Sequence, residues 1–226
     1  MLRFGGLHVK TLEQSIDRLY TSFADVPKPL RIDGCPCCIE KKNIGVLLSS
    51  PLRELTPDDL SAYAASAFLT FGTVADYLYF LPRILEISIR ISDWWPDIEV
   101  TGRAIAATEP PSWSRSHYSA LLCFLHAVID WIVASGEHCQ LDGWQLDGWL
   151  CAIARMGLDI HPFLGQVAKS PVAILAYFEV NAKCLPQNAL CNSFWELPCE
   201  GHDAIVRWFQ SEPIRKIPLE AYGYVM

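Results

Sequence analysis

The sequence predicts an all-α protein, an irregular array of about eight to ten helices, and three observations lead to this class. Apolar residues recur at spacings of three and four residues along most of the chain, as on the buried face of a helix. Several of these stretches start at a capping residue and stop at a glycine or proline. Alternating apolar and polar residues, typical of a half-buried strand, are missing apart from one candidate extended segment at residues 44–48.

The composition favours a large buried core. The chain has 226 residues, of which 51% are hydrophobic and only 19% are charged. This balance argues against disorder, and a helical array of this length fits one domain. We therefore expect residues 1–226 to form a single helical domain. The net charge of −7 argues against a general nucleic-acid binder, which would carry a basic surface.

The cysteines and the N-terminus predict a cytoplasmic protein. There are nine cysteines, an odd number, and Cys123 and Cys151 fall inside helical patterns. The N-terminal stretch MLRFGGLHVKTLEQ lacks the apolar core of a signal peptide, so we expect reduced thiols. The nearest approach to a membrane-spanning segment, residues 120–134, contains His126 and Asp130. No membrane partner is expected.

The first elements are an amphipathic helix and a short extended segment. Residues 11–23 place Leu12, Ile16 and Leu19 on one side, which predicts the helix, and two prolines end it. After a cysteine-rich turn, Ile44-Gly45-Val46-Leu47-Leu48 is interpreted as a strand or extended segment.

Two consecutive helices over residues 56–92 form the predicted centre of the fold. Thr56 and Pro57 are a strong helix start, and Thr73 caps the second helix. This second helix is apolar around most of its circumference, so neighbours are expected on several sides. Pro82 lies inside it and predicts a kink or a break. Its thin polar stripe contains Arg83, Glu86 and Arg90, interpreted as a structural ladder or, alternatively, the lining of a binding groove.

The remaining helices follow the same signals. A local duplication, 141–144 followed by 146–149, has a five-residue period that matches neither helix nor strand, so we interpret it as a loop leading into a helix that ends near Met156. The other helices are expected over residues 98–107, 112–135, 172–182, 188–195 and 199–210.

Cys35, Cys37 and Cys38 form the one metal-like cluster. Three thiolates so close together suit zinc, but a structural site needs a fourth ligand, which would have to come from a distant part of the chain. A reactive or redox role and a turn with packed thiols are the alternatives. We expect no cofactor, with zinc at these three cysteines left open.

No catalytic motif is evident, and an enzyme is not expected. The sequence contains no Gly-rich phosphate loop, no GxSxG, no HExxH and no calcium loop. His126 and Asp130 lie four residues apart, so they can meet on one helix face, and Cys123 lies on the same side. This spacing arises often by chance and is interpreted as a polar patch between packed helices.

Two neighbouring tryptophans among acids form the candidate partner-binding surface. Tryptophan is favoured at interface hot spots, and the segment supplies Asp93, Trp94, Trp95, Asp97 and Glu99. The alternative is that the tryptophans fill the core between helices.

Several motifs together resemble a widespread bacterial family. They are Cys35-Pro36-Cys37-Cys38, Leu60-x-x-Tyr63-x-x-x-Ala67, Phe80-Leu81-Pro82-Arg83-Ile84-Leu85-Glu86 and Asn192-Ser193-Phe194-Trp195. Members of this family are cytoplasmic helical proteins, and some are immunity proteins encoded beside secreted toxins. The resemblance implies an immunity protein that binds and neutralises a cognate toxin, a basic one given the acidic charge. The alternative is a metal- or thiol-dependent enzyme or regulator built around the cysteine cluster or His126.

Overall fold

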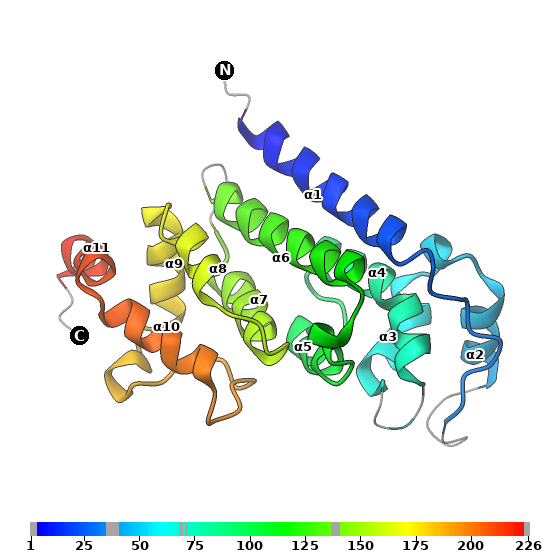
Figure 1. The fold of residues 1–226 in the computed structure, drawn as a ribbon. Coiled ribbons are helices and arrows are strands. Elements are labelled where there is room, and N and C mark those ends of the chain that lie inside the picture. Colours follow the sequence, from blue (N-terminus) through cyan, green and yellow to red (C-terminus); the bar gives the residue numbers. More distant parts are fainter. Residues whose placement is uncertain (1–3, 35–40, 68–69, 71, 137–140, 224–226) are drawn as a thin grey trace. The chain divides into compact units, whose positions relative to one another are not determined.

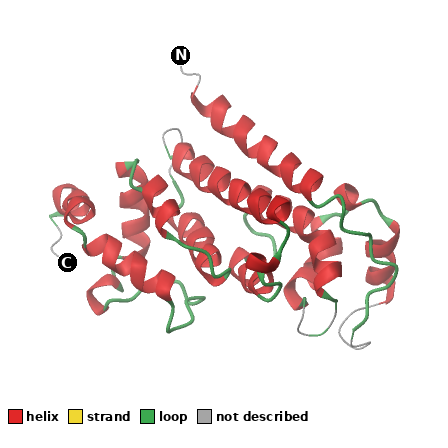
Figure 2. Ribbon diagram, in the orientation of Figure 1, coloured by secondary structure: helices red, strands yellow, loops and turns green. Residues whose placement is uncertain are grey.

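The computed structural model describes residues 4–34, 41–67, 70, 72–136 and 141–223. These residues form eleven α-helices and three short 3-10 helices. No β-strand occurs among them, and the ribbons of Figures 1 and 2 contain only helices and loops in the described part of the chain. The all-α prediction is confirmed. The α-helices are α1 Phe4–Ser22, α2 Lys41–Ser49, α3 Pro57–Ser66, α4 Val74–Arg90, α5 Ile98–Ala106, α6 Arg115–Ser135, α7 Gly143–Arg155, α8 His161–Val167, α9 Pro171–Asn181, α10 Glu200–Gln210 and α11 Glu212–Tyr222.

The chain divides into two compact units. One is formed by residues 13–124, and the other by residues 125–226 together with residues 1–12. We call them the 13–124 unit and the 125–226 unit. The division into two units does not decide whether the chain is one domain, so the single domain stays a prediction.

Two capping boxes start the central helices of the 13–124 unit. At α3 the Thr56 side chain accepts from the amide of Asp59 at 3.2 Å, and Asp59 accepts from the amide of Thr56 at 2.8 Å. Thr73 and Asp76 repeat the same exchange at α4, at 3.2 and 2.8 Å. Each box satisfies backbone donors that the first helical turn leaves unpaired. Both helix starts therefore lie where the sequence predicted them.

Helix α4 is the core of this unit. Its side chains are buried on more than one side, with Tyr77, Phe80, Leu81, Ile84 and Leu85 fully inaccessible. The helix continues through Pro82, so a break there is wrong, and the alternative of a kink stays a prediction. Helix α3 packs against α2, α4 and α5. The unit is thus organised around α3 and α4.

Residues 44–48 are helical, so the extended segment predicted there is wrong. They belong to α2, which contacts α3 and buries Leu47 completely. Ile44, Leu47 and Leu48 are spaced as i, i+3 and i+4, which places them on one helix face. The β-branched residues of this segment favour a strand, but the described residues supply no strand for it to pair with.

In the 125–226 unit, α7 begins inside the duplicated motif. Asp142 accepts from the amide of Trp144 at 2.9 Å and caps the helix, so the interpretation of the whole duplication as a loop is wrong. Helix α7 packs against α9 and α10. A Cβ atom at Gly143 would lie 2.2 Å from the carbonyl oxygen of Ala176 on α9. The glycine of the first copy therefore allows the two helices to approach closely.

Residues 188–195 do not form the predicted helix. A 3-10 helix, Leu185–Gln187, ends at Asn188, whose φ of 54° is left-handed, and the chain then runs irregularly to α10. Cys184 and Cys191 are joined by a disulfide, so the expectation of reduced thiols is wrong for this pair. Cys123, Cys151 and Cys199 form no disulfide. The bond closes a short loop that side-chain periodicity does not reveal.

Helices α8 and α11 were not anticipated from the sequence. Both begin with a proline in the first helical turn, a position where the missing amide proton costs nothing. Helix α6 has the length and hydropathy of a membrane-crossing helix, as many buried core helices do. The absence of a membrane partner stays a prediction.

Candidate functional site

The two adjacent tryptophans of the loop before α5 differ in their exposure to solvent. Trp94 is 8% exposed, and its indole N–H donates to the carbonyl of Pro57 at 2.9 Å. Trp95 is 56% exposed, while its carbonyl accepts from the hydroxyl of Ser61 at 2.5 Å. Both contacts are made with the first two turns of α3. The loop is therefore held at two neighbouring points, with one indole packed inside and the next in solvent.

The acidic residues of this segment divide in the same way. Asp93 and Asp97 are exposed, whereas Glu99 is buried on the first turn of α5. The five residues proposed from the sequence are thus close in the chain, but Trp94 and Glu99 face inward. Three of the five remain accessible to a partner.

Asp58 is an accessible carboxylate that the sequence analysis did not include. It is exposed and follows Pro57, whose carbonyl binds Trp94. It also lies one helical turn before Ser61, which binds the backbone of Trp95. We define the Trp95 surface as Asp58, Asp93, Trp95 and Asp97. The signal for Asp58 was present in the Thr-Pro-Asp-Asp helix start, but only the loop contacts link it to Trp95.

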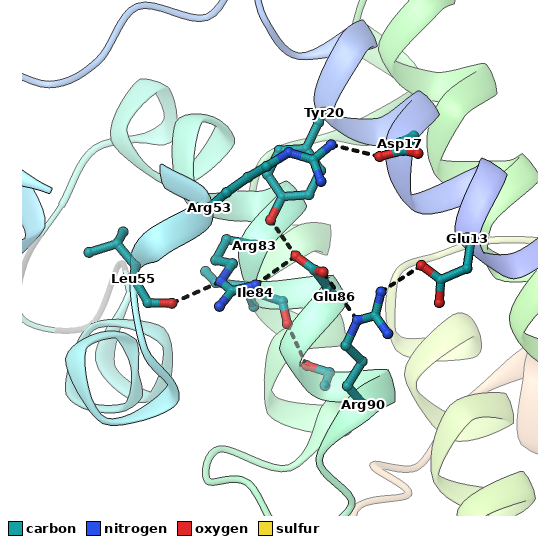
Figure 3. A network of polar contacts seen from close by, with 10 residues as sticks. Glu13, Asp17, Tyr20, Arg53, Leu55, Arg83, Ile84, Glu86 and Arg90 are labelled. Carbon is teal, nitrogen blue, oxygen red and sulfur yellow. Dashed lines mark hydrogen bonds and ion pairs between the residues drawn. The ribbon is translucent and has the colours of Figure 1, made fainter. Parts of the chain in front are cut away.

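A network of polar contacts in the same unit centres on Glu86 (Figure 3). Glu86 Oε2 accepts from the hydroxyl of Tyr20 at 2.6 Å and from Arg83 at 2.7 Å, and Oε1 accepts from Arg90 at 3.1 Å. Burial by itself would raise the pKa of Glu86, but the hydrogen bonds from Tyr20 and Arg83 and the two guanidinium charges lower it overall. Burial, with the Glu86 contact, raises the pKa of Tyr20. Glu86 is therefore held as a carboxylate.

The charged groups at the edge of this network also have hydrogen-bonding partners. Arg90 donates to Glu13 at 2.7 Å, and Arg83 donates to the carbonyl of Leu55 at 2.8 Å. Arg53 pairs with Asp17 at 2.8 Å, and its guanidinium lies 3.7 Å from the ring centre of Tyr20. These charges partner one another and join α1 to α4. The predicted Arg83–Glu86–Arg90 ladder is confirmed, and its contacts are those of a structural ladder.

His126 and Asp130 are joined through a glutamine. The Gln166 amide nitrogen donates to Asp130 Oδ1 at 2.5 Å and to the carbonyl of His126 at 3.0 Å. The amide oxygen must therefore face His126 Nδ1, 2.7 Å away, and the proton lies on Nδ1. The His126 ring stacks on the Phe163 ring, with 4.4 Å between the ring centres. Cys123 accepts a hydrogen bond from Arg18 at 3.1 Å, so each of these groups has a packing or hydrogen-bonding partner.

A buried carboxylate, Asp147, was missed by the sequence analysis. It has no exposed surface, and Asn181 donates to its Oδ1 at 3.2 Å. Burial raises the pKa of the Asp147 carboxyl, while the nearby polar groups of Asn192, Asn181, Tyr177 and Trp195 act in the opposite direction. The Tyr177 hydroxyl and the Trp195 N–H make no hydrogen bond of standard geometry within the described residues. Their opposing effect is therefore weak, and burial dominates.

The cysteine cluster Cys35, Cys37 and Cys38 lies outside the described residues. The zinc expectation there stays a prediction. Within the described ranges, no three or more histidine, cysteine, aspartate or glutamate side chains are grouped closely enough to hold a metal ion.

No model of a known protein family matches the chain, and no curated protein and no solved structure matches it.

Proposed function

We propose that this chain is an immunity protein that binds and neutralises a cognate bacterial toxin through the Trp95 surface. The observation that carries the proposal is an exposed indole on a loop that is hydrogen-bonded to α3. Asp93 and Asp97, both exposed, lie two residues before and after it in the chain, and the exposed Asp58 follows Pro57, which binds Trp94. The resemblance of the sequence motifs to a bacterial family with immunity members supports the same function.

The geometry of the loop favours tight binding. A tryptophan that becomes buried at an interface is among the strongest contributors to affinity. Association also costs free energy when loops become ordered, and this loop is already fixed to α3 by the Pro57 and Ser61 contacts. Trp95 can therefore bind a partner with little further loss of conformational entropy in the loop.

The charges favour a basic partner. Asp58, Asp93 and Asp97 of the Trp95 surface are exposed, and the whole chain carries −7. Acidic groups at the rim of an interface steer a basic protein and pair with its lysines or arginines. We therefore expect the toxin to present cations around an apolar pocket that accepts the indole.

The test compares two exposed tryptophans. Trp95→Ala should raise the dissociation constant for the product of an adjacent toxin gene by about thirtyfold or more, the effect of losing an interface hot spot. Trp144 is 53% exposed and lies in the 125–226 unit, so Trp144→Ala is the matched control. It should change the dissociation constant less than about twofold. Calorimetry measures both, and co-expression with the toxin measures protection.

A charge-reversal variant at Asp93 and Asp97 provides a second test of the Trp95 surface. The variant Asp93→Lys/Asp97→Lys should lose binding while it melts like the wild type, because both side chains are exposed. Glu99 is excluded, since a lysine at this buried position would disturb the fold. Full protection by the Trp95 and Asp93/Asp97 variants would show that the surface is wrong. An intact protein that neither binds nor protects would refute the immunity function itself.

A further inference from the structure

A pocket of about 290 Å³ lies in the 125–226 unit, whereas the Trp95 surface belongs to the 13–124 unit. It is lined by Leu185, Pro186, Asn188, Gln210 and Arg215. The first three residues lie between the two cysteines of the disulfide, Gln210 ends α10, and Arg215 lies on α11. Three segments thus enclose the pocket.

The walls of the pocket are fixed by contacts within this unit. The Cys184–Cys191 disulfide closes the loop that carries Leu185, and Leu185 itself is buried. Asn188 completes the turn, with its amide donating to the carbonyl of Leu185 at 2.9 Å. The side chain of Gln210 donates to that of Asn188 at 2.8 Å, which ties the loop to the end of α10. The pocket therefore exists before any ligand arrives.

The polar groups of the pocket keep unused hydrogen-bonding capacity. The Asn188–Gln210 contact consumes one amide N–H and one carbonyl, which leaves an amide nitrogen on one side chain and a carbonyl on the other. Arg215 has no acidic partner within the described residues. On the same helix, Lys216 pairs with Glu212 at 2.8 Å, so the nearest carboxylate in sequence is already taken.

We propose that this pocket binds a small organic carboxylate. The Arg215 guanidinium supplies two parallel donors, the arrangement that suits a carboxylate, and the remaining amide N–H adds a neutral one. Leu185 and Pro186 pack against the apolar part of the ligand. The volume is at the lower end of ligand pockets, which limits the occupant to about the size of one aromatic ring with a short acid chain.

The test uses phenylacetate and its neutral isostere phenylacetamide as probes on the full chain with its disulfide intact. Amide chemical shifts are followed by NMR during titration. Phenylacetate should give saturable shifts in the lining loop and at Arg215, with at least about tenfold tighter binding than phenylacetamide, because only the acid pairs with the guanidinium. Equal affinities, or shifts that never saturate, would overturn the proposal.

A matched pair of arginine variants separates the pocket from the general surface charge. Arg215→Gln should weaken phenylacetate binding at least about tenfold. Arg207→Gln removes the same charge from an exposed position of α10 that does not line the pocket, and should leave the affinity unchanged. Both side chains are exposed, so both variants should melt like the wild type. If Arg207→Gln weakens binding as much as Arg215→Gln, the carboxylate does not occupy this pocket.

Discussion

Asp147 and Asp142 occupy equivalent places in the two copies of the duplicated motif and have opposite surroundings. Asp142 is exposed and caps α7, whereas Asp147 lies one turn further on with no exposed surface. A charge in this interior is costly when no cation neutralises it, and the residues named beside Asp147 are all neutral. The burial of this one carboxyl therefore links the stability of the 125–226 unit to pH.

The sign of this link follows from the raised pKa of Asp147. The folded state holds the proton more tightly than the unfolded chain does. The stabilisation is therefore complete below the unfolded pKa, near 3.8, and is lost as pH rises through the folded pKa. We expect the free energy of unfolding of the wild type to fall over this range relative to that of Asp147→Asn, which cannot ionise. Denaturant unfolding across the acidic to neutral range measures the difference, and parallel curves for the two proteins would refute it.

Burial at single residues explains why the candidate site was only partly predictable. Trp94 and Trp95 are adjacent and identical in type, so composition cannot tell which one faces the interior. The choice depends on Pro57 and Ser61, more than thirty residues earlier, which bind the loop. Glu99 was assigned to the candidate surface together with the other acids beside the tryptophans, yet it is buried on α5. Asp147 was missed for the same reason, because its burial also depends on residues that are distant in the sequence.

At the scale of elements, local signals were sufficient where a helix is specified by its own residues. The starts of α3 and α4 were predicted because Thr56–Asp59 and Thr73–Asp76 exchange hydrogen bonds within four residues. The predictions for residues 188–195 and 44–48 were wrong because contacts with residues outside each stretch decide their conformation. The first stretch is constrained by a disulfide, and the second is helical because it packs on α3.

The burial of α4 leads to a stability prediction. Leu81 is completely inaccessible, so Leu81→Ala should lower the free energy of unfolding by about 2–5 kcal/mol through lost packing and a residual cavity. Val74 lies at the start of the same helix and is 42% exposed, so Val74→Ala should stay within about 0.5 kcal/mol of the wild type. Urea unfolding measures both. A similar cost for the two variants would mean that α4 is not the centre of its unit.

At the scale of the whole molecule, the excess of acidic over basic residues, 25 against 18, creates a long-range negative field. Such a field acts mainly on the encounter between two proteins, whereas the contact made by Trp95 acts mainly on the lifetime of the complex. The proposed function therefore predicts two separable kinetic effects.

Salt should distinguish these two effects. Raising the ionic strength from about 0.01 M to about 0.1 M shortens the screening length from about 30 Å to about 10 Å. The association rate constant with a basic toxin should fall about tenfold or more over this range, while the dissociation rate constant changes little. Stopped-flow mixing and surface-based dissociation measure the two constants. An association rate that is insensitive to salt would argue against a basic partner.

The division of Trp94 and Trp95 between interior and solvent also has an optical consequence. An indole in water emits at longer wavelength than one enclosed by protein, so two neighbouring fluorophores of one loop emit differently. Trp95 is open to small quenchers, and Trp94 is shielded behind its contact with Pro57. When a second molecule covers the loop, the red-shifted and quenchable contribution of Trp95 disappears, while that of Trp144, which is also exposed, remains. The loop thus carries its own fluorescent signal of occupancy, and no label is needed to read it.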